Sequence, residues 1–225
     1  MIQFRSIDDG RSWRNEGRPM SRAMGSPDFR GSLDHCVAGK SIFVPVITPA
    51  EGTKKSVYLL RSRDEGRSWE RAGAITEGSN LINETGILHL GGDKLMVVAR
   101  ASQENATYLG VSEDLGETWG PMRDISEQVG VVQQPNLIKL SNQPGRIYLA
   151  GRARKKETAQ RNGLWWSDNL GQHWQGGVLD EQDFIDTGYG DMLSRSDGNM
   201  VYLAYRGRDS RAETFSYVFR VPSKP

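Results

Sequence analysis

A motif of eight residues occurs four times along the chain, and it limits the possible folds more than any other feature. Each copy begins with serine, carries glycine four residues later and ends with tryptophan after another three residues. The copies begin at Ser6, Ser62, Ser112 and Ser167, which are 56, 50 and 55 residues apart. Because self-similarity at such a period indicates a repeat architecture, we expect one structural unit to recur through the chain.

The composition of the motif is typical of a hairpin turn. An aspartate carboxylate accepts hydrogen bonds from the amides of its own turn, glycine adopts the positive φ that a tight reversal needs, and tryptophan fills the space between neighbouring sheets. Asp8, Asp64 and Asp114 stand at the third position, whereas the fourth copy has Asp168 one place earlier and His173 before its tryptophan. We interpret these aspartates as structural rather than catalytic.

Short apolar runs alternate with turn residues between the copies, which predicts β-strands without helices. Each complete unit holds four runs. They cover Leu33–Val37, Ile42–Val46, Val57–Arg61 and the stretch after Trp69, then Gly86–Leu90, Lys94–Arg100, Thr107–Val111 and the stretch after Trp119, then Asn136–Leu140, Arg146–Gly151, Leu164–Ser167 and Trp174–Leu179. Three more follow at Gly188–Ser194, Asn199–Tyr205 and Thr214–Val221. This pattern predicts a single all-β domain over residues 1–225, a β-propeller of four-stranded antiparallel blades.

Length, charge and single residue types exclude several classes of protein. The 225 residues carry 29 Lys and Arg against 28 Asp and Glu, so a net charge of +1 argues against nucleic-acid binding. Apolar stretches such as Leu95–Ala99 are far shorter than the roughly 20 residues of a membrane helix, so no membrane insertion is expected. Cys36 is the single cysteine, and His35, His89 and His173 lack metal-ligand spacing, so we expect neither a disulfide framework nor a metal or other cofactor. The first residues show no signal peptide, so the default expectation is a cytoplasmic protein, or a secreted one if an N-terminal part is missing.

Alignment of the units on their second strands predicts which residues meet at the propeller axis. The strand positions taken as equivalent are Ile42, Leu95, Ile147 and Val201. The first strands then open at Gly31, Glu84, Gln134 or Pro135, and Tyr189. Because first strands line the axis of a propeller, we expect these residues to converge. The second strands end at Arg100, Arg152 and Arg206, which we expect near the opposite rim unless the intervening turn brings them to the same mouth.

A glutamate, a tyrosine and several arginines near one mouth favour a particular chemistry. The planar guanidinium group binds a carboxylate through paired N–H bonds, so clustered arginines indicate an anionic ligand. A phenol with the usual pKa of about 10 is a poor nucleophile until a neighbouring carboxylate accepts its proton. Glu84 is the candidate base for Tyr189.

Three stretches resemble the sialidase (neuraminidase) family, whose turn motif is the Asp-box or BNR repeat. Asn83–Leu90, followed by Leu95–Ser102, looks like the family segment that carries the catalytic glutamate and the second arginine of a triad. Arg161–Ser167 is similar to the segment with the third arginine, and Thr187–Met192 to the stretch with the nucleophilic tyrosine. With the four repeats, the resemblance spans nearly the whole chain.

The resemblance implies an exo-α-sialidase-like glycoside hydrolase that releases terminal sialic acid from sialylated or other acidic glycans. Tyr189 would be the nucleophile and Glu84 its base. Arg100 and Arg161 would bind the substrate carboxylate, and Arg152 could supply the same charge as Arg161. A phenol suits this substrate because the sugar's own carboxylate would repel a carboxylate nucleophile.

The chain also departs from the family pattern. The family's first arginine and its acid/base aspartate lie upstream of the first repeat, where this chain has only five residues. Asp28 and Asp34 are the remaining candidates for a proton donor. The strand count predicts a ring of about five blades, or part of a six-bladed ring that lacks its N-terminal portion. Two alternatives stay open: a non-catalytic propeller that binds acidic glycans or a protein partner, and a propeller with a different glycan chemistry.

Overall fold

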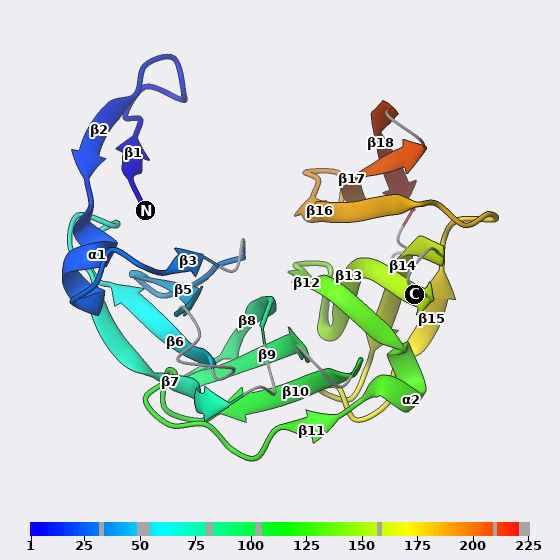
Figure 1. Ribbon diagram of the computed structural model, residues 1–225, viewed down its shortest axis with the longest axis horizontal. Coiled ribbons are helices and arrows are strands. Elements are labelled where there is room, and N and C mark those ends of the chain that lie inside the picture. The colour runs from blue at the N-terminus through cyan, green and yellow to red at the C-terminus, as the bar shows by residue number, and fades with distance from the viewer. Residues whose placement is uncertain are drawn as a thin grey trace.

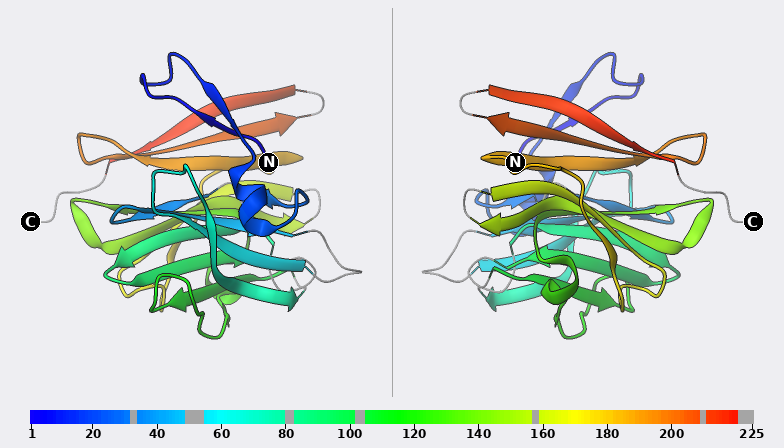
Figure 2. Two further views of the ribbon diagram at one scale, coloured as in Figure 1. Left: turned by 90° about the vertical axis from the view of Figure 1, so that its left-hand side faces the viewer. Right: turned by 90° about the vertical axis from the view of Figure 1, so that its right-hand side faces the viewer.

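A computed structural model shows antiparallel sheets that follow one another around an arc (Figure 1). It describes residues 1–31, 34–48, 55–79, 83–101, 105–156, 159–208 and 211–220. Chain order is also spatial order, from a hairpin at one end of the arc to a three-stranded sheet at the other (Figures 1 and 2). The expected all-β architecture of antiparallel sheets is confirmed.

Five sheets contain all the strands of the described residues. The first is the hairpin of β1 (Gln3–Arg5) and β2 (Arg14–Gly17). The second contains β3 (Arg30–Gly31), β4 (Cys36–Ala38), β5 (Ser41–Ile47), β6 (Lys55–Ser62) and β7 (Glu70–Ser79). The third contains β8 (Thr85–Gly91), β9 (Lys94–Arg100), β10 (Thr107–Ser112) and β11 (Arg123–Asp124). The fourth contains β12 (Val131–Leu140), β13 (Gln143–Lys156), β14 (Ala159–Ser167) and β15 (Gln175–Val178). The fifth contains β16 (Asp186–Ser194), β17 (Met200–Arg208) and β18 (Arg211–Phe219).

Two short helices correct the expectation of strands alone. Helix α1 (Pro19–Met24) joins β2 to β3, and helix α2 (Ser126–Val129) is a single turn before β12. Helix α1 has proline in its first turn and ends at Gly25, which has a φ of 66°, and both residues favour a helix boundary at those places. Its apolar face packs on the core beside β5 and β6. Neither helix has the length and apolar character needed to cross a membrane, and the described ranges contain no other helix.

The strand predicted at Leu33–Val37 is the main difference between the expected and observed strands. Here the chain forms β3 and β4 instead, and Leu33 lies outside the described residues. The Asp34 side chain explains part of the break between β3 and β4. Its carboxylate accepts a hydrogen bond from the His35 amide at 2.8 Å, and that amide is then not available to pair with a neighbouring strand. The other predicted strands are present within the described residues, and those at Asn136–Leu140 and Arg146–Gly151 extend further as β12 and β13. Val221, the last residue of the predicted strand Thr214–Val221, lies outside the described residues.

The four repeats form the expected turns. In every copy the serine Oγ accepts the glycine amide, at 2.7 to 2.9 Å. Ser12 and Ser68, each four residues after the aspartate of its turn, donate hydrogen bonds to Asp8 and Asp64. These bonds lower the pKa of both carboxyls to about 2. In the fourth copy Asn169 takes the place of the carboxylate and accepts the amide of residue 173 at 2.8 Å, which leaves Asp168 free of this role.

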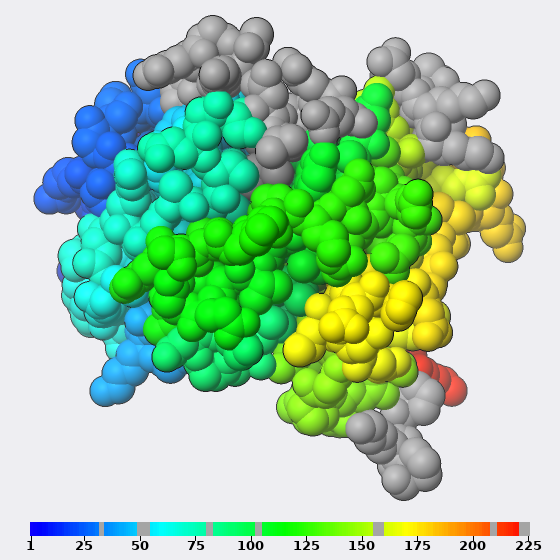
Figure 3. All heavy atoms as spheres, turned by 90° about the horizontal axis from the view of Figure 1, so that it is seen from below, coloured from blue at the N-terminus to red at the C-terminus, as the bar shows by residue number. Residues whose placement is uncertain are grey.

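The third and fourth repeat turns each pack against the third strand of the preceding sheet. A Cβ placed on Gly116 would lie 2.2 Å from Leu59 of β6, and one on Gly171 would lie 2.6 Å from Leu109 of β10. Apolar clusters fill the spaces between the second, third, fourth and fifth sheets. Seen from below, the atoms of successive sheets follow one another in chain order across the outer face (Figure 3). The turns therefore act as spacers that set how closely the sheets approach.

Candidate functional site

Tyr189 and Glu84, which are 105 residues apart in the sequence, are in contact. The Tyr189 hydroxyl donates a hydrogen bond to Glu84 Oε1. Glu84 Oε2 lies 3.2 Å from Arg100 Nη1 and accepts the Gln134 amide at 2.9 Å. Glu84 directly precedes β8, Gln134 lies in β12 and Tyr189 in β16. Three successive first strands therefore converge, as the register predicts.

Tyr189 and Gln134 occupy equivalent positions in their sheets. Each lies in a β-bulge, where the first strand has one residue more than its partner strand. Their φ angles are 48° and 45°, in the left-handed region that non-glycine residues rarely adopt. Gly190 makes the bulge possible beside Tyr189, because a Cβ there would lie 1.9 Å from the carbonyl oxygen of Leu203. The bulges turn both residues toward Glu84 instead of along the sheet faces.

The electrostatics of the pair correspond to a neutral phenol that donates to a carboxylate. Burial opposes ionisation of Glu84, but the Tyr189 hydrogen bond, the Arg100 charge and the Gln134 amide outweigh it and lower the pKa of the Glu84 carboxyl. Burial and the hydrogen bond to Glu84 raise the pKa of Tyr189, against the opposing charges of Arg152 and Arg100. At neutral pH the Glu84 carboxylate is therefore ionised and can accept a proton from the phenol.

Arg152 lies against the ring of Tyr189. Its guanidinium carbon is 4.6 Å from the ring centroid, within the range of a cation–π contact. Its Nη1 also lies 2.5 Å from Asp186 Oδ1, and the other oxygen of that carboxylate accepts the Tyr205 hydroxyl at 2.5 Å. Gly188 allows this approach, because a Cβ there would lie 2.6 Å from Arg152 Cβ.

Of the two positions expected for Arg100 and Arg152, the structure shows the one at the mouth and not the one at the opposite rim. Arg100 contacts Glu84, and Arg152 contacts Tyr189. In an antiparallel hairpin the end of the second strand lies beside the start of the first, so residues at these positions share one end of the sheet. Arg206 follows the same rule in β17, where it pairs with Thr187 of β16, but its side chain contacts Asp180 and Tyr217.

Arg161 has other partners. Its Nε lies 2.5 Å from Asp183 Oδ1, and its Nη1 donates to the Asp180 carbonyl at 3.3 Å. The described residues show no contact from Arg161 to Glu84 or Tyr189, so its place in a carboxylate clamp stays a prediction.

Two members of the site, Arg30 and Asp186, are not predicted from the sequence. Arg30 of β3 lies 3.4 Å from Asn83 Oδ1, beside Glu84. It directly precedes Gly31, which the register already placed near the axis, so this signal was available. Asp186, three residues before Tyr189 in β16, carried no motif that could reveal it.

Asp34 joins the first strands near the axis. Its carboxylate accepts the amides of His35 and Ile87, each at 2.8 Å, and the Leu137 amide also stabilises its charge. Burial, with a smaller contribution from the Asp191 charge, nevertheless raises the pKa of Asp34 to about 7. Asp34 therefore links the second sheet to β8 and β12.

We expect this raised pKa to make folding stability depend on pH. A carboxyl whose pKa is higher in the folded than in the unfolded protein stabilises the folded state most below pH 4. This stabilisation is lost as the pH rises through 7. Three pKa units correspond to about 4 kcal/mol at most, and partial exposure reduces the expected loss to about 2 kcal/mol. Urea unfolding at pH 4.5, 5.5 and 7.5 gives the free energy of unfolding of the Asp34→Asn variant and of the wild type. The difference between the two proteins at each pH measures the contribution of Asp34. The variant should gain relative stability as pH rises, and equal pH slopes for the two proteins would contradict the prediction.

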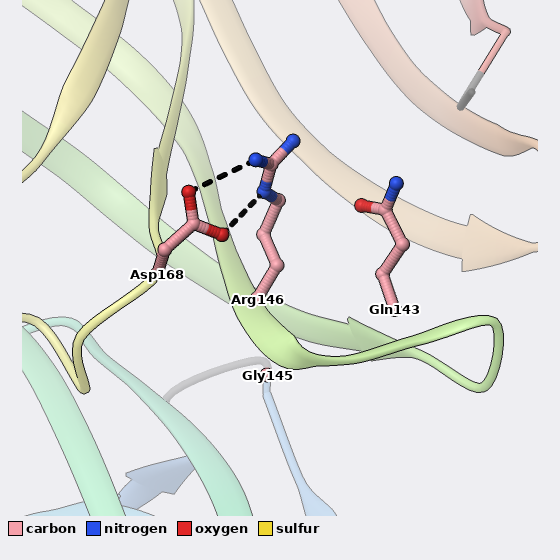
Figure 4. Close-up of a pocket in the computed structure, with 4 residues that line it drawn as sticks. All are labelled: Gln143, Gly145, Arg146 and Asp168. Atoms are coloured by element: carbon pink, nitrogen blue, oxygen red, sulfur yellow. Dashed lines mark hydrogen bonds and ion pairs between the residues drawn. The ribbon is translucent and has the colours of Figure 1, made fainter. Parts of the chain in front are cut away.

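A peripheral pocket of about 360 Å³ lies at the other end of β13 from Arg152. It is lined by Gln143, Gly145, Arg146 and Asp168, and Asp168 binds Arg146 through two hydrogen bonds of 2.7 and 2.9 Å (Figure 4). The aspartate displaced from the fourth repeat turn is thus in an ion pair. Within the described ranges, no cluster of three His, Cys, Asp or Glu side chains is arranged to hold a metal ion.

Successive antiparallel sheets, four of which carry an Asp-box turn between their last two strands, and a tyrosine–glutamate pair where the first strands meet define a sialidase-like fold of the BNR-repeat class. The chain belongs to the family of the BNR repeat-like domain, whose model matches residues 1–203. A search of curated proteins found no match.

Solved structures share this fold at low sequence identity. A protein of unknown function from Dyadobacter fermentans is 18% identical with a TM-score of 0.77, over 96% of this chain and 63% of that protein. The Trypanosoma rangeli sialidase in complex with 2,3-difluorosialic acid, a covalent intermediate, is 19% identical with a TM-score of 0.71, over 96% of this chain and 37% of the sialidase. An endo-arabinase from Bacteroides thetaiotaomicron is 14% identical with a TM-score of 0.67, over 98% of this chain and 86% of that enzyme. The chain therefore spans less than two thirds of the first two proteins, and these matches show the fold alone.

Proposed function

We propose that the protein is a glycoside hydrolase that releases terminal sialic acid, with Tyr189 as nucleophile and Glu84 as its base. The observation that carries the proposal is the hydrogen bond from the Tyr189 hydroxyl to Glu84, with Arg100 and Arg152 on either side of the pair. The sialidase-like fold supports it. Sialidases are the glycosidases that use a tyrosine nucleophile.

The reaction divides into two displacements at the anomeric carbon. In the first, Tyr189 Oη forms a bond to that carbon while its proton passes to Glu84, and the aglycone oxygen leaves with the bonding electron pair. In the second, water adds to the anomeric carbon and gives up a proton to the carboxylate that protonated the aglycone, or to solvent when the aglycone left as an anion. The bond to Tyr189 breaks with its electron pair on the phenolic oxygen, and Glu84 returns the proton to that oxygen. The aglycone needs a proton unless it is a stable anion, and Asp28 and Asp34 are the candidates from the sequence.

The arginines of the site supply the charge that an acidic sugar requires. Arg100 and Arg152 flank the Tyr189–Glu84 pair, and Arg30 lies beside Asn83. Among the described residues, Arg30 forms no salt bridge with a carboxylate, so its charge is available to an anionic ligand. Asp180, Arg161 and Arg206 belong to a neighbouring network, and we assign Arg161 only a secondary part in binding the carboxylate.

The sheets would be blades of a propeller around this mouth. Convergence of the first strands of the third, fourth and fifth sheets on Glu84 supports that arrangement. We infer a ring of five or six blades.

Hydrolysis of two sialosides tests the proposal. The purified chain is given 4-methylumbelliferyl sialoside, which has an anionic leaving group, and sialyllactose, whose leaving oxygen needs a proton. Turnover of the first supports the proposal, and a much slower reaction of the second would show that no residue of the chain protonates the aglycone efficiently. Binding of sialic acid without turnover of either would favour the non-catalytic propeller. Turnover of an arabinan or another neutral glycan alone would favour a different glycan chemistry.

A further inference from the structure

Arg152 already has a carboxylate partner within the chain. Asp186 Oδ1 lies 2.5 Å from its Nη1. The Arg152 side chain is 11% exposed, whereas the Asp186 side chain is 51% exposed. The ion pair thus has a buried cation and a carboxylate that water reaches.

Tyr205 holds this carboxylate in place from the second strand of the same sheet. Its hydroxyl donates to Asp186 Oδ2 at 2.5 Å, so both carboxylate oxygens are engaged at once. Arg152 Nε is buried and has no hydrogen-bond partner among the described residues. A ligand can therefore bind only those N–H groups of the Arg152 guanidinium that do not already donate to Asp186.

We propose that Asp186 is a specificity-determining residue, which neutralises Arg152 in the free protein and weakens the preference of the site for acidic over neutral sugars. This inference rests on the proposed function, because it concerns the ligand of the same site. A ligand carboxylate bound at Arg152 would lie close to the Asp186 carboxylate, and two like charges around one guanidinium repel each other. Removal of the Asp186 charge leaves Arg152 free to attract an anion.

The Asp186→Asn variant tests this, because asparagine retains an oxygen that accepts from Tyr205 or Arg152. The probes are N-acetylneuraminic acid and its methyl ester, which differ by one charge, and calorimetry gives the affinity for each. The variant should bind the acid about tenfold more tightly, while its affinity for the ester stays within twofold of wild type. The control is Asp168→Asn, which removes the same charge from the Arg146 pair at the peripheral pocket and should leave both affinities unchanged.

A second measurement needs no sugar and separates this inference from the proposed function. Ultraviolet titration gives the ionisation midpoint of Tyr189 as the difference between a protein and its Tyr189→Phe counterpart. The Arg152 charge favours the phenolate, so Asp186→Asn should lower the Tyr189 midpoint. Failure of every protein to bind either sugar would refute the proposed function alone. An unmoved Tyr189 midpoint, or an acid-to-ester affinity ratio equal to wild type, would overturn the role of Asp186.

Discussion

Replacement of Tyr189 by phenylalanine should reduce kcat/KM on an activated sialoside by about three orders of magnitude or more. Loss of the nucleophile removes the covalent route, and effects of this size are typical when one member of a catalytic unit is lost. The ring that packs against Arg152 remains, so substrate binding should change much less than turnover. Initial rates with 4-methylumbelliferyl sialoside over a range of concentrations separate kcat from KM.

Tyr148→Phe is the matched control, because it also deletes one phenolic hydroxyl. That hydroxyl donates to Gln143 at 2.6 Å, toward the beginning of β13 and away from Arg152. The control should keep its rate within a factor of two, apart from a modest loss of stability. If Tyr189→Phe kept more than a tenth of the wild-type kcat/KM, Tyr189 would not be the nucleophile.

A covalent trap would locate the bond directly. In the Trypanosoma rangeli protein, 2,3-difluorosialic acid forms a covalent intermediate. The same compound should add its glycosyl mass to the peptide that contains Tyr189, as seen by mass spectrometry after digestion. Label on another residue would contradict the assignment.

The convergence of Glu84, Gln134 and Tyr189 could be predicted because two local signals determined it. The repeat turns specified where each unit begins, and the apolar runs specified the pairing of strands, so first-strand residues followed by counting. The two bulges were harder to predict, since their φ angles above 40° occur at glutamine and tyrosine rather than glycine. Pro135 was a usable hint, because proline within a sheet is confined to edges and bulges.

The partners of the arginines could not be predicted from the sequence. Arg152 pairs with Asp186 34 residues away, and Arg161 pairs with Asp183 22 residues away. Such choices depend on side-chain conformations that are set only after the sheets pack, and arginine can reach several carboxylates from one strand position. The position of Arg100 itself could have been decided from the sequence, because the antiparallel pairing rule places it beside Glu84.

Replacement of Gly116 by alanine should lower the free energy of unfolding by about 2 to 4 kcal/mol. Gly116 has a φ of 83°, which costs an alanine about 1 kcal/mol. Its new Cβ would also lie 2.2 Å from the Leu59 methyl group, and Leu59 is fully buried, so overpacking adds about 1 to 3 kcal/mol. Urea unfolding followed by tryptophan fluorescence measures the change.

Gly10 in the first repeat separates the two contributions. Its φ is 81°, but a Cβ there would meet only Trp13, at 3.7 Å, and Trp13 is 64% exposed. Gly10→Ala should therefore cost only the backbone part, about 1 kcal/mol. A Leu59→Ala change should destabilise the Gly116→Ala protein less than the wild type, because a smaller side chain makes room for the new methyl group. Equal losses for Gly10→Ala and Gly116→Ala would mean that the turn glycine serves backbone geometry alone and not the spacing between the second and third sheets.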